Sequence, residues 1–334
     1  MISSTIVADS ISKQGHRLTT FVLMFPRIVL AEFNTHRMLS KNSASSRAIP
    51  FAKMLEKVRT TPFIPIKWMK EHKGMQGTEY FTDPKDIDVL KSLWLSAANS
   101  AIQMSERLSK NEVTKQLCNR LLEPFMYHTV IVTGSEFENF FALRAHPQAE
   151  IHIADLAEKM LVAYNESTPK SLKEGQWHIP FGEDVSTALT EDLVFKYAKK
   201  EVCDIGWHSP FDPSDPKSIK WDKLIDSYKV KIATARCARV SYLNFEGKDD
   251  YQADLKLHDT LLDSGHMSPF EHCARAMSDY EHYNWSINTP DAEEMGMGPR
   301  QLGWCGNFRG FVQYRKTLSG ENKSDNRVMQ KKYE

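Results

Sequence analysis

Cysteine is scarce in this sequence, with five residues in 334, and no C-x-x-C pair or zinc-finger spacing occurs. An odd, widely spaced set predicts free thiols in a reducing cytoplasm, not a disulfide framework or a zinc module. The chain also lacks an apolar run of about eighteen residues, the minimum for a membrane helix. Near residue 1 no basic segment precedes an apolar one. We therefore expect neither a membrane protein nor an exported one.

An excess of charge of one sign is absent too, because 43 basic side chains balance 43 acidic ones. This balance argues against a nucleic-acid polymer as partner, since such binding needs many phosphate contacts, but it leaves a small anionic ligand open. No G-x-S-x-G motif occurs, and neither Cys118 nor Cys237 has a histidine nearby in the sequence. The chain therefore offers no clear nucleophile for covalent catalysis. The glycines of GMGPRQLG are interrupted by Pro299, which disfavours a dinucleotide loop.

What is present is a globular composition, with 41% hydrophobic and 26% charged residues and no low-complexity linker. HRLTTFVLMFP predicts a buried strand that ends at Pro26, followed by a helix over residues 27–38. Further helices are expected at 49–59 and at 250–266, the latter capped by Gly265. Residues 61–85 and 206–218 are expected to be irregular, because prolines interrupt them and little periodicity remains.

Two longer helical regions follow from apolar spacing. The pattern over residues 86–108 predicts an amphipathic helix whose buried stripe is Leu90, Leu93, Ala97, Ala101, Met104 and Leu108. Residues 119–169 predict two helices on either side of Pro147. The second of these has an inward stripe of Ile153, Leu156, Met160 and Tyr164.

The run NTHRMLSKNSASSRAIP, residues 34–50, concentrates hydrogen-bond donors in a segment with few apolar residues. Arginine and serine side chains, with the backbone N–H groups of a turn, can form a cradle for an anion. The alternative is a solvated Ser/Asn loop that caps a helix.

Two other polar segments have simpler interpretations. His266, Glu271 and His272 do not have the spacing of helical metal ligands, so a polar cluster that fixes a turn is favoured over a metal site. Arg309, Gln313 and Arg315 could contact an anion, but an exposed basic edge is favoured.

Several blocks resemble the flavin-dependent thymidylate synthases. The R-H-R-x7-S signature of that family, with its following arginine, is matched by Thr35, His36, Arg37, Ser45 and Arg47. Its A-R-V-S-[YF] strand is matched by residues 238–242, and its G-H-x-[ST]-P-F-E-H turn by residues 265–272. Its helical block is matched by three segments, 120–124, 139–145 and 149–153. The family places the strand and the turn before the signature, whereas this chain places them after it. The order resembles that of a circular permutant.

The resemblance implies roles for individual residues. The nucleotide contacts would be Glu32, Ser45, Ser46, Arg47, Arg120 and Arg144. The flavin contacts would be His36, Arg37, Asn139, Gln148, Ser241 and His266. The residues closest to the chemistry would be Arg47, Arg144 and His266. The chain departs from the family at Thr35 for arginine, Ser43 for glutamate, Glu32 for glutamine and Gln148 for histidine.

The resemblance also implies a reaction without a protein nucleophile. With FAD, methylenetetrahydrofolate and NADPH, a methyl group would be transferred to C5 of a pyrimidine deoxynucleotide, with dUMP to dTMP favoured. The alternatives are hydroxymethylation of dUMP or dCMP, and a nucleotide-binding relative without catalysis.

The implied fold is α+β, with long helices packed on a mainly antiparallel sheet, circularly permuted and assembled as a homotetramer. We expect one catalytic domain over residues 1–334. Its matched blocks are 1–60, 115–169 and 233–280, and its additional elements are 61–114, 170–232 and 281–334.

Overall fold

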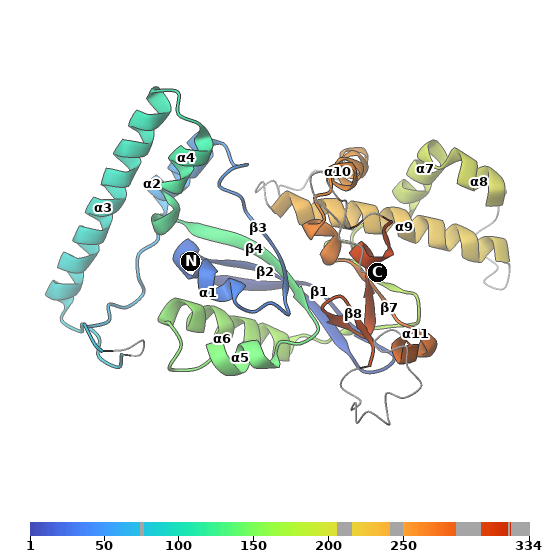
Figure 1. Cartoon of the computed structure of the whole chain (residues 1–334), viewed down its shortest axis with the longest axis horizontal. Coiled ribbons are helices and arrows are strands. Elements are labelled where there is room, and N and C mark those ends of the chain that lie inside the picture. Colours follow the sequence, from blue (N-terminus) through green and yellow to red (C-terminus); the bar gives the residue numbers. More distant parts are fainter. Residues whose placement is uncertain (74–76, 206–215, 241–249, 285–301, 320, 322–334) are drawn as a thin grey trace, which may run out of the picture. The chain divides into compact units, whose positions relative to one another are not determined.

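The structure is a computed structural model that describes residues 1–73, 77–205, 216–240, 250–284, 302–319 and 321 (Figure 1). The chain forms two compact units, which are described separately. The first unit comprises residues 1–11, 16–171 and 237–247, and the second comprises 12–15, 172–236 and 248–334.

The first unit is built on a five-stranded sheet with the order β3-β4-β2-β1-β5. Its pairs β1–β2, β2–β4 and β3–β4 are antiparallel. The strands are β1 Ser3–Ser12, β2 Arg17–Pro26, β3 Ser40–Ser43, β4 Tyr127–Gly134 and β5 Lys170–Leu172. The helices are η1 Arg27–Val29, α1 Leu30–Asn34, α2 Phe51–Thr60, α3 Pro84–Lys110, α4 Lys115–Arg120, η2 Glu123–Phe125, α5 Glu138–Arg144 and α6 Ile151–Glu166.

The main core of this unit lies between one face of the sheet and helices α1, α5 and α6 (Figure 1). Alternate residues of β2, namely Phe21, Leu23 and Phe25, are fully buried there. Their β4 partners Val132 and Val130 complete the same face. The period of two thus directs the branched and aromatic side chains of both strands toward the helices.

Several sequence predictions for this unit are confirmed, and two helices are shorter than expected. The strand ending at Pro26, the helix α2 and the buried stripe of α6 are present. The helix expected over 27–38 is shorter, because α1 ends at Asn34. The helix expected before Pro147 covers only α5, because Tyr127–Gly134 forms β4. By its local sequence alone, the run TVIVT could form a helix or a strand. Its β-branched residues pair with strands on both sides, and this pairing stabilises the strand.

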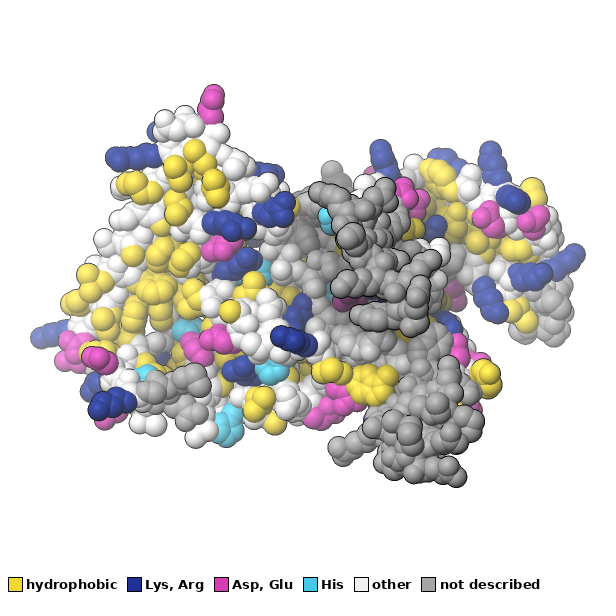
Figure 2. All heavy atoms as spheres, in the orientation of Figure 1, with side chains coloured by type: hydrophobic (Ala, Val, Ile, Leu, Met, Phe, Trp, Pro, Cys, Tyr) yellow, Lys and Arg dark blue, Asp and Glu magenta, His cyan; other side chains and the backbone are white. Residues whose placement is uncertain are grey.

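Helix α3 is present, but its predicted inward stripe is wrong. Leu93 is 64% exposed and Met104 is 43% exposed, whereas Ala98 and Ile102 are buried. Apolar residues occupy two faces of this helix, so the spacing alone did not decide which face packs. Figure 2 shows hydrophobic side chains on the surface over this part of the first unit.

The second unit combines helices with two small sheets. A three-stranded sheet has the order β10-β7-β6, and β8 pairs with β9. The strands are β6 Trp177–His178, β7 Ala274–Ala276, β8 Trp304–Cys305, β9 Phe308–Arg309 and β10 Phe311–Gln313. The helices are α7 Thr187–Tyr197, α8 Lys199–Ile205, α9 Pro216–Arg239, α10 Tyr251–Asp263, η4 Ser268–Glu271, α11 Asp279–Asn284 and η6 Tyr314–Thr317.

Helix α10 ends as its sequence predicts. Gly265 has φ +73°, its N–H donates to Leu262 O at 3.1 Å, and the His266 N–H donates to Leu261 O at 2.9 Å. This is the Schellman arrangement that glycine permits. The strand expected at 238–242 is wrong for its first two residues, which end α9. Ser241 and most of the loop expected at 206–218 lie outside the described residues.

The mixed helices and antiparallel sheets confirm the α+β class. Among the helices in the described ranges, none combines the length and the apolar character needed to cross a membrane.

A buried histidine in the first unit predicts acid sensitivity. His128 is 1% exposed, and its Nδ1 lies 3.1 Å from Nη1 of Arg27. Burial and the positive charge of Arg27 lower the pKa of His128 from 6.5 to about 3. Between these values the unfolded chain binds a proton that the folded chain does not. The free energy of unfolding should therefore fall as the pH is lowered below 6.5, by about 1.4 kcal/mol per pH unit for this group.

Urea unfolding of the wild type and of His128→Asn at several pH values between 7 and 4 checks this prediction. The variant loses packing at every pH, but its unfolding free energy should depend less steeply on pH. Equal slopes for the two proteins would contradict it.

Candidate functional site

The polar run at residues 34–50 leaves α1, forms edge strand β3 and turns into α2. The strand is fixed by its register with β4, in which Lys41 pairs with Val132 and Asn42 with Ile131. The Asn42 amide also donates to Cys237 O at the end of α9, at 3.2 Å. The run is therefore an ordered part of the first unit, and its side chains have defined positions.

His36 and Arg144 are brought together although 108 positions separate them in the sequence. Nε of Arg144, at the end of α5, donates to Nε2 of His36 at 2.9 Å, and Nη2 donates to the Thr35 hydroxyl at 3.4 Å. The edge of the imidazole contacts Phe140, with 4.9 Å between ring centroids. Burial, with the charges of Arg144 and Lys41, lowers the pKa of His36 to about 4. The imidazole is thus neutral at pH 7 and accepts a hydrogen bond from arginine.

Glu32 lies in α1, one turn before His36. Its Oε2 is buried and has no hydrogen-bond partner among the described residues. Burial and the negative charge of Glu150 raise its pKa, while Arg144 opposes the shift. Glu150 itself caps α6 by accepting from the N–H groups of His152 and Ile153. Glu32 is therefore an unsatisfied acceptor beside Arg144.

A buried asparagine of α4 holds the loop after β3 by hydrogen bonds to its backbone. Asn119, 0% exposed in α4, donates to Ser46 O at 2.7 Å and to Ile49 O at 3.0 Å. Within the loop the Ser45 hydroxyl accepts from the Arg47 N–H at 3.3 Å. The guanidinium groups of Arg47 and Arg120 are exposed, and neither makes a hydrogen bond or ion pair with any described residue. Arg47 on the fixed loop and Arg120 at the end of α4 thus keep their guanidinium donors available, which suits an anionic ligand.

Removing the support of this loop should cost stability. Asn119→Ala deletes two hydrogen bonds and leaves two buried carbonyl groups unpaired, at about 1 to 3 kcal/mol for each group. We expect the free energy of unfolding to drop by about 2 to 4 kcal/mol, measured by urea denaturation. Asn111→Ala, at the exposed end of α3, is the control and should change it by less than about 1 kcal/mol. Equal effects would contradict the supporting role of Asn119.

Three predicted flavin contacts of the first unit are exposed: Arg37 after α1, Asn139 in α5 and Gln148 before α6. The backbone N–H of Gln148 donates to Nδ1 of His146 at 3.2 Å. No contact between these three side chains and the His36–Arg144 pair is present among the described residues. Their assignment to a flavin stays a prediction.

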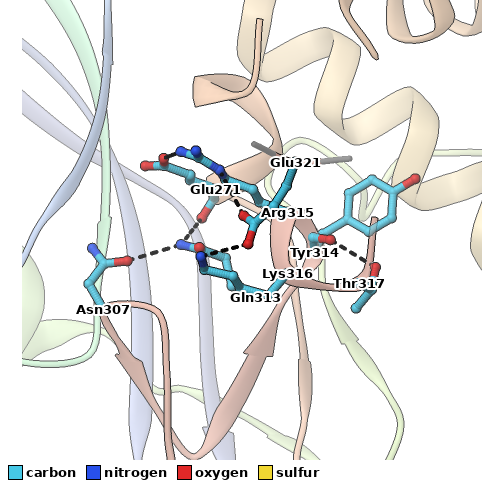
Figure 3. A network of polar contacts seen from close by, with 8 residues as sticks. All are labelled: Glu271, Asn307, Gln313, Tyr314, Arg315, Lys316, Thr317 and Glu321. Carbon is cyan, nitrogen blue, oxygen red and sulfur yellow. Dashed lines mark hydrogen bonds and ion pairs between the residues drawn. The ribbon is translucent and has the colours of Figure 1, made fainter. Parts of the chain in front are cut away.

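The block Gly265–His272 lies in the second unit, where His266 is exposed and its Nδ1 lies 2.9 Å from the Ser264 hydroxyl. The rest of the block is tied to the chain near residue 315, as Figure 3 shows. Glu271 pairs with Arg315, which also contacts Glu321 at 3.2 Å. This supports the interpretation of Glu271 as part of a polar cluster that fixes a turn.

The exposed basic edge expected for Arg309, Gln313 and Arg315 is wrong. Gln313 is 2% exposed, and its amide donates to Asn307 Oδ1 at 3.0 Å (Figure 3). Arg309 donates to Leu302 O at 3.1 Å. Acceptors six or seven residues earlier in the chain occupy Gln313 and Arg309, and Glu271 from a distant segment neutralises Arg315.

Lys41 and Asn119 are site residues that sequence reasoning did not assign. Lys41 is half-buried in β3, and its ammonium donates to His36 O. Burial lowers the pKa of Lys41 to about 8. A lysine within a short strand and an asparagine beside a candidate arginine were the only local signals, and neither is specific.

Comparison with known proteins finds a family model that is similar to most of the first unit. Residues 11–170 match the family described as thymidylate synthase complementing protein. Two solved structures of the UMP/dUMP methylase PolB from Streptomyces cacaoi are similar to the chain. The complex with 5-Br UMP has 16% identity and a TM-score of 0.42, covering 50% of this chain and 89% of that one. The complex with 5-Br dUMP has 19% identity and a TM-score of 0.37, covering 45% and 67%.

No curated protein matches the chain. The segment matched by the family contains the His36–Arg144 pair and the loop of Arg47, whereas Gly265–His272 lies outside it. The match to the family described as thymidylate synthase complementing protein thus covers residues 11–170, just under half of the chain.

Proposed function

We propose that the protein transfers a one-carbon unit from methylenetetrahydrofolate to C5 of a pyrimidine deoxynucleotide, converting dUMP to dTMP with FAD as cofactor. The observation that carries the proposal is the family match over residues 11–170. Within that segment Arg144 is bonded to the signature residue His36. NADPH as reductant and a homotetrameric assembly are further parts of the proposal.

The nucleotide would be held by the loop after β3. Arg47 and Arg120 have free guanidinium groups for a phosphate, and Ser45 and Ser46 add hydroxyl donors. Arg144, beside the unsatisfied carboxyl of Glu32, would also help to hold the nucleotide. A fixed loop lowers the entropic cost of orienting the substrate.

The donor set of the first unit also fits an anionic flavin dinucleotide. His36 and Arg37 would bind it together with Asn139 and Gln148, and we assign Ser241 and His266 to the same cofactor. When bound, the flavin supplies the hydride chemistry that amino-acid side chains lack. The protein residues bind, orient and keep water away from the reacting carbon.

We also propose that the chain is a circular permutant of this family. Its A-R-V-S block follows the signature in sequence, yet Cys237, directly before that block, accepts a hydrogen bond from Asn42 of β3. Cys237 and the described start of the block, residues 238–240, therefore belong to the first unit. This contact supports a rearranged order that preserves the neighbours of the signature.

Hydroxymethylation is the second candidate product. Ser43 and Gln148 replace a glutamate and a histidine of the family pattern, and Gln148 is exposed. Methylation requires the attached carbon to be reduced before water attacks it. Smaller or more exposed groups near the pyrimidine would favour water.

Product analysis tests the proposal. The purified protein is incubated with FAD, NADPH, methylenetetrahydrofolate and either dUMP or dCMP, and the nucleotide is weighed by mass spectrometry. We expect dTMP from dUMP. A hydroxymethyl product would replace the methylation assignment, and turnover of dCMP alone would replace the substrate. Absence of flavin binding and of any product would leave the non-catalytic alternative.

A further inference from the structure

Lys41 is a half-buried cation without an anionic partner. Its ammonium donates to the backbone oxygen of His36 and lies 5.2 Å from the centroid of the Phe33 ring. It forms no ion pair with any described residue. Partly buried charges are normally paired, because removal from water is costly. The position of Lys41 therefore needs an explanation other than packing.

A second cation approaches the same two residues from another helix. Arg144 bonds to the imidazole of His36 and to the hydroxyl of Thr35, and it too has no ion pair with a described carboxylate. The charges of Lys41 and Arg144 both lower the pKa of His36, so both lie near its ring. Two positive groups thus flank one neutral imidazole.

The nearby acids do not neutralise this positive region. Glu150 is engaged by the first turn of α6 and by His152. Glu32 interacts with Arg144 but makes no ion pair with it among the described contacts, and burial raises its pKa. Both cations also keep free donors: an ammonium has three N–H groups, of which Lys41 uses one. Free donors and unbalanced charge in a half-buried place are the requirements for binding an anion.

We propose that Lys41 and Arg144 form an anion site at Thr35–His36, which binds a phosphate group of a nucleotide-type ligand, and that Lys41 supplies the charge absent at Thr35. The identity of the ligand rests on the proposed function, in which the phosphate belongs to FAD or to dUMP. Lys41 is on the α1 face of β3, directly opposite Val132, so its side chain reaches the 35–36 backbone from the strand. The positive charge that the family signature carries at position 35 would thus come from Lys41 of strand β3 in this chain.

The test is a set of calorimetric titrations of inorganic pyrophosphate, FAD and dUMP into four full-length proteins. These are the wild type, Lys41→Met, Lys41→Arg and Lys159→Met. Lys159 lies on exposed α6 surface of the same unit and pairs with Asp155, so its substitution controls for loss of one positive charge. Thermal unfolding of each variant shows that it is folded.

We expect Lys41→Met to weaken pyrophosphate binding by about ten- to a hundredfold, the effect of one charge-assisted hydrogen bond. Lys41→Arg should retain most of the affinity, and Lys159→Met should retain all of it. If Lys41→Met also weakens the binding of FAD but not of dUMP, the phosphate belongs to the flavin. If it weakens the binding of dUMP but not of FAD, the phosphate belongs to the substrate.

Absence of pyrophosphate binding by the wild type, or equal affinity of the wild type and a folded Lys41→Met, would overturn the anion site. Lys41-dependent pyrophosphate binding without any binding of FAD or dUMP would support the anion site and refute the proposed function. The two conclusions can therefore fail independently.

Discussion

Replacing Arg144 by alanine is expected to have the largest effect on activity, a loss of at least about a hundredfold in kcat/KM for dUMP. In the proposed function the substitution removes a cation that helps to hold the nucleotide, at about 1.5 to 3 kcal/mol for its charged hydrogen bond. It also removes the donor that holds the His36 ring at 2.9 Å. Two groups of the site are disturbed by one change, so the effect should exceed that of a single contact.

The pKa of His36 provides a second measurement. Burial, Arg144 and Lys41 together lower this pKa to about 4. Without Arg144 the pKa should rise, which a histidine titration followed by NMR detects. Arg59→Ala, which removes an exposed ion pair between α2 and Glu106 of α3, is the control and should affect neither quantity. An unchanged His36 pKa together with normal turnover would exclude the role assigned to Arg144.

Replacing Arg47 by alanine is expected to separate binding from stability. The side chain is exposed and has no partner among the described residues, so the free energy of unfolding should change by less than about 0.5 kcal/mol. If Arg47 contacts the phosphate, the affinity for dUMP should fall by about 1.5 to 3 kcal/mol, or roughly ten- to a hundredfold.

Calorimetric titration of dUMP and thermal unfolding measure the two effects. Arg107→Ala, at the end of α3, removes another exposed arginine and should leave the affinity unchanged. An unchanged affinity in Arg47→Ala would restore the simpler interpretation of residues 34–50 as a solvated loop that caps a helix.

The elements predicted best are those whose local signals agree with their packing. β2 ends at Pro26, α6 buries its 3.6-residue stripe, and Gly265 ends α10 with a positive φ. In each of these elements, a single local signal decides the structure: a regular spacing of apolar residues, or a proline or glycine whose backbone geometry ends the element. α3 was predicted as a helix but oriented wrongly, because a helix with apolar residues on two faces requires knowledge of its neighbours.

The sequence named residues of the candidate site but not the contacts between them. His36 and Arg144 were both named, yet their bond depends on how α5 reaches the end of α1. Lys41 was not assigned a role because its importance comes from what surrounds it: a ring, a carbonyl and no carboxylate. The opposite error occurred at Arg315, where Glu271 and Glu321 bind the side chain. Whether a cation is available depends on the carboxylates that the fold places beside it, such as Glu271, 44 residues away from Arg315.

The edge strand β3 makes the length of the signature segment more critical than its composition. Lys41 faces α1 because it pairs with Val132, and its neighbours Ser40 and Asn42 point to the other side of the sheet. Deleting or inserting one residue between His36 and Ser40 would exchange these faces and remove the ammonium from the imidazole. Between α2 and α3, the described residues pair only at the isolated bridge of Met69 with Tyr80, which belongs to none of the sheets. Relatives with the same chemistry should therefore vary in length between α2 and α3, and keep a constant spacing between the histidine and the strand.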